Sequence, residues 1–304
     1  YFVDFNFGWN GSENFQPGSQ YGFFPSIALG WVATNYDFVK ENLRWLSFFK
    51  IRMSYGEVGN DAISSQRFPY MTTISSGQNA ITHWGGTGIL TEDLIGADNL
   101  VWEKAMKYNL GVDTKFFQDN LSITLDFFKD ERDGIFQQRT QVPSYIGAVT
   151  MPYGNVGSMV SWGSDGNIEY FQKIKKDLSF TLRANYLYSL NKVLRWEEPE
   201  QRFPYKERSG YPTDVQRGYI SLGLFEDELD VLSSPTQFGV VRPGDIKYKD
   251  VNGDGRINED DMVPLFASFG GFNPPAFSYG VGGSLNYKKF SLNFLFKGIG
   301  NRYF

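Results

Sequence analysis

The clearest chemistry in this 304-residue sequence lies between Asp250 and Asp261, which reads DVNGDGRINEDD. Oxygen-bearing side chains occupy its first, third, fifth and twelfth positions: Asp250, Asn252, Asp254 and Asp261. This is the spacing of a calcium-binding loop, in which alternate side chains converge on one ion and the seventh residue, here Arg256, contributes its backbone carbonyl. The pattern predicts a Ca²⁺ site with a structural role.

Two features limit this interpretation. A helix–loop–helix calcium site carries glutamate at the twelfth position, whereas Asp261 is shorter and must approach an ion more closely. The preceding residues, Asp245 to Lys249, read as a strand, so we expect a loop within a longer loop and not a complete helix–loop–helix hand. The alternative is a pair of tight Asn-Gly and Asp-Gly turns that needs no metal.

Tryptophans are the second group of candidate binding residues. Three of them, Trp84, Trp162 and Trp196, fall in expected loops, where an exposed indole can stack on a sugar or simply pack against its own loop. The other four are Trp9, Trp31, Trp45 and Trp102, which lie near expected strand ends and fit the aromatic girdle of a membrane barrel.

No catalytic constellation is visible. The sequence has no Gly-x-Ser-x-Gly elbow, no phosphate-binding P-loop and a single histidine, His83, so we predict that the chain is not an enzyme. The acidic run Glu226-Asp227-Glu228 reads as a solvated loop. Zero cysteines exclude disulfides and thiolate metal sites, and a net charge of −5 without a basic stripe argues against nucleic acid as a partner.

The elements that must position these residues are strands. Five segments alternate apolar and polar residues with a period of two, so each has one apolar and one polar face. Their apolar members are Val3-Phe5-Phe7-Trp9, Leu121-Ile123-Leu125-Phe127, Phe180-Leu182-Ala184-Tyr186-Tyr188-Leu190, Phe277-Tyr279-Val281-Gly283-Leu285-Tyr287 and Phe290-Leu292-Phe294-Phe296. Alternation alone fits either a transmembrane β-barrel or a large soluble sandwich or propeller.

The spacing of turns and loops favours the barrel. Strands are expected at roughly 1–9, 21–33, 48–56, 106–117, 121–130, 166–172, 177–190, 276–287 and 290–299. Tight turns at 118–120, 173–176 and 288–289 alternate with long polar stretches at 57–105, 131–165 and 191–275, while 34–47 has room for a short helix. Outer-membrane barrels have short periplasmic turns and long extracellular loops, so this alternation has a physical cause there.

The sequence contains no run of 18 apolar residues, so a transmembrane helix is not expected. The chain starts at Tyr1, already within a strand, which indicates a segment of a longer polypeptide. About nine strands would leave two open edges, and unpaired backbone groups are costly in hydrocarbon. We therefore expect further strands outside this segment to close the barrel.

Several motifs, in order, resemble the SusC/RagA family of TonB-dependent outer-membrane transporters of Bacteroidetes. They are Tyr21 to Ser26 with Gly30-Trp31, Leu46 to Gly59, Asp98 to Lys104 followed by Tyr108 to Asp113, Asn155-Val156-Gly157, Gly218-Tyr219 with Gly223 to Phe225, and Gly244 to Tyr248 leading into Asp250 to Gly255. The likeness spans essentially the whole chain, residues 1–304. Residues Ser158 to Gly166 depart from the family's usual continuation.

The resemblance implies an all-β fold: part of an antiparallel transmembrane β-barrel of about 22 strands, without its plug, TonB box and last strands. It implies a multi-pass protein of the cell outer membrane that imports a glycan or an oligopeptide with a SusD-like lipoprotein, powered by the TonB–ExbB–ExbD system. The competing interpretations are a secreted, calcium-stabilised adhesin or lectin-like protein and, less well supported, a glycan-active propeller enzyme. The residues do not distinguish a glycan from a peptide substrate.

Overall fold

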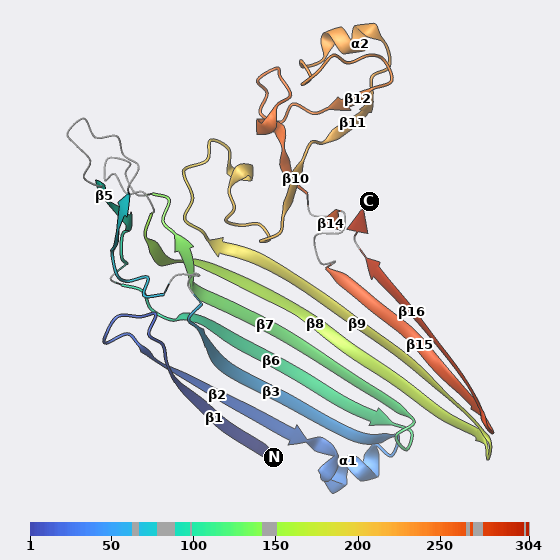
Figure 1. Ribbon diagram of the computed structural model, residues 1–304. Coiled ribbons are helices and arrows are strands. Elements are labelled where there is room, and N and C mark those ends of the chain that lie inside the picture. Colours follow the sequence, from blue (N-terminus) through green and yellow to red (C-terminus); the bar gives the residue numbers. More distant parts are fainter. Residues whose placement is uncertain are drawn as a thin grey trace.

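The structure is a computed structural model that describes residues 1–62, 67–77, 89–97, 99–141, 151–265, 268–269, 276–300 and 302–303. Nine strands form one large antiparallel sheet in the order β1-β2-β3-β6-β7-β8-β9-β15-β16 (Figure 1). The strands are β1 (Phe2–Gly11), β2 (Tyr21–Val32), β3 (Leu46–Asn60), β6 (Glu103–Phe116), β7 (Leu121–Gln138), β8 (Tyr153–Lys175), β9 (Leu178–Arg195), β15 (Phe277–Tyr287) and β16 (Phe290–Gly300).

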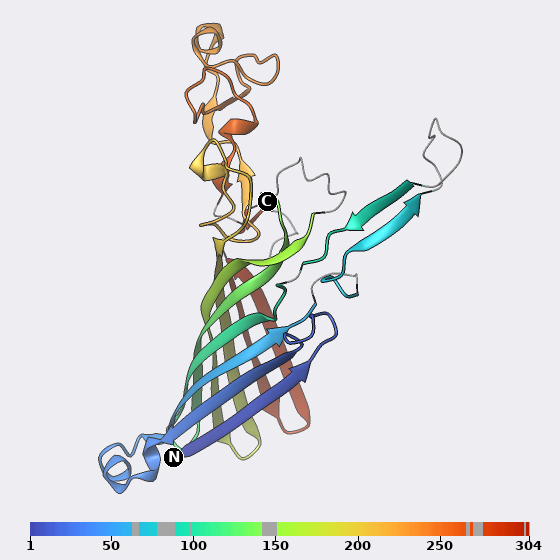
Figure 2. The same ribbon diagram turned by 90° about the vertical axis from the view of Figure 1, so that its left-hand side faces the viewer.

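The sheet is curved and open. Figure 2 shows it bending into a trough, with β1 along one free edge and β16 along the other. Every neighbouring pair is antiparallel, as the alternating sequence pattern predicted. A curved antiparallel sheet with two free edges is the form that a section of barrel wall must take.

The pairing register places the alternating residues on two consistent faces. Ile27 lies opposite Tyr55, Tyr55 opposite Tyr108, and the same face continues across the sheet. We call this the apolar face: it includes Phe5, Leu29, Met53, Leu110, Phe127, Ile168, Leu182, Val281 and Phe294. Leu121, Ile123 and Leu125 lie on it, whereas Ser122, Thr124 and Asp126 lie on the opposite, polar face, as predicted.

Many side chains of the apolar face are exposed, among them Phe290 at 78% and Leu292 at 65%. A contiguous apolar surface of this extent marks an interaction surface, and here it spans the width of the sheet. Hydrocarbon is the environment that suits it.

Short connections gather at one end of the sheet, which we call the short-turn end. Phe117, Gln118 and Asp119 join β6 to β7 with φ of 54°, 58° and 68°, and Lys288 turns from β15 to β16 with φ of 51°. Between β2 and β3 lie η1 (Ala33–Asn35) and α1 (Asp37–Asn42), so the short helix for which 34–47 has room is present. The long connections lie at the other end, the long-loop end (Figure 1).

Several strands are longer than predicted, which shortens the expected loops; β3, for example, continues to Asn60. β7 continues to Gln138, β9 continues to Arg195, and β8 begins at Tyr153 rather than near 166. The stretch 131–165 was expected to be a long loop because it is polar and rich in glycine and proline, and glycine and proline are depleted in strands. Residues 153–165 of it form part of β8. They are strand because β8 is paired on both sides. Gly163 suits this crowded position, since a Cβ there would lie 2.1 Å from the carbonyl oxygen of Tyr188.

The longest connection forms a projecting module, residues 196–265, which stands beyond the long-loop end (Figures 1 and 2). It contains η3 (Pro204–Lys206), β10 (Gln216–Gly218) paired with β13 (Val263–Leu265), β11 (Ser221–Leu224) paired with β12 (Ile246–Tyr248), α2 (Glu228–Ser233) and η4 (Glu259–Asp261). β12 confirms the strand expected before the calcium-type loop.

Two further small pairs lie outside this module. β4 (Thr73–Gly77) pairs with β5 (Ile89–Leu94), and β14 (Ser268–Phe269) pairs in parallel with β17 (Arg302–Tyr303). None of the helices among the described residues is long and apolar enough to cross a membrane.

Candidate functional site

The calcium-type loop is a chain of side-chain-to-backbone turns. Asp250 accepts hydrogen bonds from the N–H of Gly253 at 2.7 Å and of Gly255 at 2.8 Å. Both glycines have left-handed φ values, 75° and 80°, which a glycine adopts without strain. Asn252 accepts from the N–H of Asp254, and Asp254 from the N–H of Arg256, each at 2.9 Å. The first half of the loop is therefore folded by its own side chains.

Asp261 closes the loop from within. Its carboxylate is fully buried. One oxygen accepts the N–H of Val251 at 2.8 Å and, more distantly, that of Asn252 at 3.4 Å, while the other accepts the N–H of Asn258 at 2.9 Å. Asn258 in turn caps η4 by accepting the N–H of Asp260. A buried carboxylate is tolerated only when it is paired or bonded in this way.

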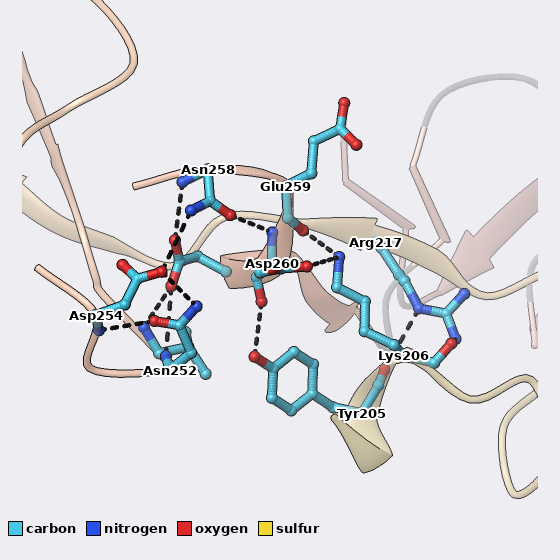
Figure 3. A network of polar contacts seen from close by, with 10 residues as sticks. Tyr205, Lys206, Arg217, Asn252, Asp254, Asn258, Glu259 and Asp260 are labelled. Atoms are coloured by element: carbon cyan, nitrogen blue, oxygen red, sulfur yellow. Dashed lines mark hydrogen bonds and ion pairs between the residues drawn. The ribbon is translucent and has the colours of Figure 1, made fainter. Parts of the chain in front are cut away.

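Residues from η3 hold the other side of the loop (Figure 3). The Tyr205 hydroxyl donates to the carbonyl of Asp260 at 2.6 Å, and Lys206 donates to the carbonyl of Glu259. Arg217 donates to the carbonyls of the η3 segment, which fixes its position. The loop is thus integrated into the projecting module.

The loop is electronegative. Burial raises the pKa of Tyr205, and the negative charges of Asp261, Asp260, Asp250 and Asp254 raise it further. The pKa of Asp254 is lowered chiefly by the hydrogen bond from the N–H of Arg256; slight desolvation opposes this, and hydrogen bonds from Asn252 and Asn258 add to the lowering. Several ionised carboxylates close together create a potential that attracts a cation.

Calcium prefers oxygen donors such as those of the loop, but these oxygens already accept hydrogen bonds from the loop's own backbone. Among the described residues, no three aspartate, glutamate, histidine or cysteine side chains come together as a group that could hold a metal ion. The carboxylates of Asp250, Asp254 and Asp261 each accept hydrogen bonds from backbone N–H groups. Calcium binding at Asp250, Asn252, Asp254, Arg256 and Asp261 therefore stays a prediction.

Of the three tryptophans singled out as candidate ligand contacts, the structure describes two, Trp162 and Trp196. Trp162 is not in a loop: it lies in β8 on the apolar face, between Lys129 and Leu190 of the neighbouring strands. Trp196 begins the projecting module, and the Arg208 guanidinium stacks 4.4 Å from its ring centre. Trp84 lies outside the described residues.

An aromatic cluster at the long-loop end, which sequence reasoning missed, joins the β1–β2 and β5–β6 connections to strand β7. Phe15, from the β1–β2 loop, is fully buried with Leu100, and Trp102 and Phe136 pack against them. The ring centres of Phe15 and Trp102 are 5.1 Å apart, and the Trp102 indole N–H donates to the carbonyl of Gln20 at 3.2 Å. Trp102 therefore packs in this cluster. The sequence had suggested a place in the aromatic girdle.

Asn155, the first residue of the Asn155-Val156-Gly157 motif, joins three segments of backbone. Its side chain accepts the N–H of Val101 at 2.9 Å and donates to the carbonyls of Val101 at 2.8 Å and Gly134 at 2.7 Å. An asparagine can make all three bonds because its amide has both a donor and an acceptor. Gly134 is left-handed, with φ of 67°, at the irregularity in the β7–β8 pairing.

Glu197 anchors the start of the projecting module to the β7–β8 connection. Its carboxylate accepts the N–H groups of Thr140 at 2.9 Å and Gln141 at 3.0 Å and forms an ion pair with Arg139 at 2.6 Å. Burial opposes ionisation of Glu197, but the two N–H groups and the guanidinium outweigh it, so its pKa is lowered. These partners are 56 to 58 positions away, so no local pattern reveals them.

The polar face carries a charged cluster that spans three strands. Arg52 of β3 contacts Asp113 of β6 at 2.8 Å and Asp126 of β7 at 3.0 Å. Gly111 lies between them, and a Cβ there would meet the guanidinium at 2.6 Å. The missing side chain at Gly111 lets Arg52 cross β6 to reach β7. Asp165 of β8 lies opposite Asp126 in the next strand.

Comparison with known proteins agrees with this geometry. The family model described as "TonB dependent receptor-like, beta-barrel" matches residues 2–300. TonB-dependent receptor P3 of Formosa agariphila is 26% identical over 95% of the chain and 29% of its own length. TonB-dependent receptor SusC of Bacteroides thetaiotaomicron is 25% identical over 100% of the chain and 30% of its own length.

Solved structures show the same fold. The chain superposes on the RagAB peptide importer in its "open-open" state with a TM-score of 0.75, at 19% identity, over 99% of this chain and 31% of that chain. The "closed-closed" state gives a TM-score of 0.72 at 20% identity, over 99% of this chain and 32% of that chain. The chain thus spans less than a third of the length of the curated relatives and of these structures.

Proposed function

This chain belongs to the TonB dependent receptor-like β-barrel family, and from that premise we propose that it forms one section of the wall of an outer-membrane importer. The observation that carries the proposal is the pair of faces. The apolar face extends across all nine strands, and the polar face carries the Arg52 cluster. Such a sheet separates lipid from an aqueous lumen when closed into a barrel.

We place the long-loop end outside the cell. Short turns lie on the periplasmic side of bacterial outer-membrane barrels and long loops on the extracellular side. The projecting module and the aromatic cluster around Phe15 then face the medium, where substrate arrives. The relatives are named as receptors, which agrees with the expectation that the chain is not an enzyme.

The complete protein would import a bulky nutrient, a glycan or an oligopeptide. It would work with a SusD-like surface lipoprotein over its mouth and with the TonB–ExbB–ExbD system as its energy source. Support comes from the likeness to SusC in sequence and to the RagAB peptide importer in fold. If the protein were instead a secreted adhesin or lectin-like protein, the large apolar side chains of the apolar face would be exposed to water.

Two measurements test this function. The intact receptor should require detergent and should migrate faster on SDS gels before heating than after it; a protein that stays soluble without detergent would be an adhesin. Cells that express it should accumulate fluorescent oligosaccharides or oligopeptides only when TonB is present. Uptake that is identical without TonB would refute active import.

We also propose that Ca²⁺ binds the loop from Asp250 to Asp261. Asp250, Asn252, Asp254 and Asp261 would supply side-chain oxygens and Arg256 its carbonyl. The electronegative potential at Tyr205 and the oxygen-rich donor set support this, whereas the engaged carboxylates weigh against a ready-made site. The ion would stiffen the loop by removing repulsion between the carboxylates and would take no part in chemistry.

A further inference from the structure

The far tip of the projecting module carries large apolar side chains that nothing in the described structure covers. We call them the tip patch: Leu222, Leu224, Leu229, Leu232 and Ile246. Leu229 is 75% exposed and Leu232 81%. Three of the leucines line a hollow of about 610 Å³ together with acidic residues. Clustered exposed apolar residues of this kind mark interaction sites in water-soluble surfaces.

Lipid does not explain this patch. β11, β12 and α2 lie at the end of the module farthest from the nine-stranded sheet (Figures 1 and 2). The apolar face of the sheet meets the membrane, whereas the tip stands well beyond the long-loop end. We therefore expect a protein partner to bind the tip patch.

The rim of the hollow is acidic. Glu226, Asp227, Glu228 and Asp230 follow one another closely, and the one nearby lysine, Lys247, is already ion-paired to Asp230 at 2.6 Å. Glu226 and Glu228 are exposed. Two copies of this surface would repel each other across an interface, which disfavours self-association through the tip. The rim favours a partner with lysine or arginine around an apolar contact.

The tip is ordered before any partner arrives. Phe225 is almost fully buried, its N–H donates to the carbonyl of Asp245 at 2.9 Å, and its carbonyl accepts from Gly244 at 2.8 Å. Asp227 caps α2 by accepting the N–H of Asp230 at 2.7 Å. A preorganised surface loses little conformational entropy on binding.

We propose that the tip patch is the docking surface of the surface lipoprotein that covers the importer, and that this lipoprotein presents an apolar contact ringed by basic residues. This inference rests on the proposed function. It adds the place of contact, at a distance from the barrel mouth, and the chemistry that recognises it. A lid held at the tip of a projecting module can stay attached while its other side moves.

Single-cysteine labelling of the intact receptor in cells tests the docking. The 304 residues contain no cysteine of their own. Leu229→Cys should react with a membrane-impermeant maleimide in cells that lack the lipoprotein, and at least tenfold more slowly in cells that contain it. Glu200→Cys, exposed in the same module outside the patch, is the matched control and should react alike in both.

Each other outcome is decisive. If Leu229→Cys fails to react without the lipoprotein, the rest of the receptor's own chain covers the patch and the inference is overturned. If it reacts equally with and without a lipoprotein that co-purifies with the receptor, the docking surface lies elsewhere although the proposed function stands. If no lipoprotein co-purifies with the wild type, the partnership itself fails, and the inference fails with it.

Binding of purified lipoprotein to purified receptor tests the chemistry. Leu224→Ser combined with Leu229→Ser should weaken binding at least tenfold, because both side chains lose their apolar contact. Glu226→Lys should slow association, and more so at low salt, because it reverses one charge of the rim. Faster association of Glu226→Lys would show an acidic partner and would overturn the charge argument.

Discussion

Replacing Asp261 should open the calcium-type loop, whether or not metal is present. The carboxylate is fully buried and accepts two short hydrogen bonds, from the N–H of Val251 at 2.8 Å and of Asn258 at 2.9 Å. Asp261→Ala leaves both of these part-buried donors without an acceptor. Each such donor costs about 1 to 3 kcal/mol, so local opening should become easier by about 2 to 6 kcal/mol.

Hydrogen exchange of the intact receptor, followed by mass spectrometry of peptides that cover residues 250–261, measures this opening. At about 1.4 kcal/mol per factor of ten, even the lower figure raises the exchange rate about 30-fold. The control is Asp260→Ala. Its side chain is 44% exposed and pairs with Lys206 at 3.7 Å, so removing it should cost about 0 to 1 kcal/mol.

The measurement is made in chelator and again in calcium. If residues 250–261 exchange at the same rate in Asp261→Ala and Asp260→Ala in chelator, the Asp261 carboxylate does not close the loop. If the two variants differ only when calcium is added, Asp261 acts as a metal ligand and not as a cap. The heat-dependent shift of the barrel on SDS gels should stay unchanged in both variants, because the large sheet does not depend on the loop.

Three more predictions follow from the faces, from the Glu197 anchor and from the loop. Phe294→Arg, on the apolar face, should destabilise the barrel by about 2 to 4 kcal/mol if it lies near mid-membrane and lower the temperature of its gel shift, whereas Asn293→Arg on the polar face should not. Because the pKa of Glu197 is lowered in the folded state, its stabilisation is complete above the unfolded pKa and is lost as pH falls through the folded pKa. The protection factors of the Thr140 and Gln141 amides, whose N–H groups donate to Glu197, should therefore be high at pH 7 and fall as the carboxylate is protonated in acid, and Glu197→Gln should remove that pH dependence. Asp250→Ala with Asp254→Ala should leave the barrel assembled but abolish calcium-dependent protection of residues 196–265 from protease; identical cleavage of the wild type in calcium and chelator would mean tight turns without metal.

Sequence alone was sufficient for the features that depend on local periodicity. A period of two assigns Leu121, Ile123 and Leu125 to one face regardless of which strands are neighbours. The alternation of short turns and long loops predicted antiparallel pairing, and the spacing from Asp250 to Asp261 predicted a sharp glycine turn. Each of these inferences uses residues that are close together in the chain.

Tertiary structure decided the features that depend on distant partners. Residues 158–165 belong to the stretch predicted as a loop from its polar, glycine-rich composition, yet they form strand because β7 and β9 both pair with them. That pairing places Trp162 on the apolar face. Asp261 was predicted to be a metal ligand from its position in the loop, and the fold adds backbone N–H partners that this spacing does not reveal.

Dependence on distant partners also explains the contacts that no sequence motif predicted. Arg52 reaches Asp126 across 74 positions of the chain, and Glu197 reaches Thr140 across 57. Such contacts exist because the sheet order brings β3 near β7 and the end of β9 near the end of β7. Periodicity determines which face a side chain occupies, whereas the order and register of the strands determine which side chain it meets there.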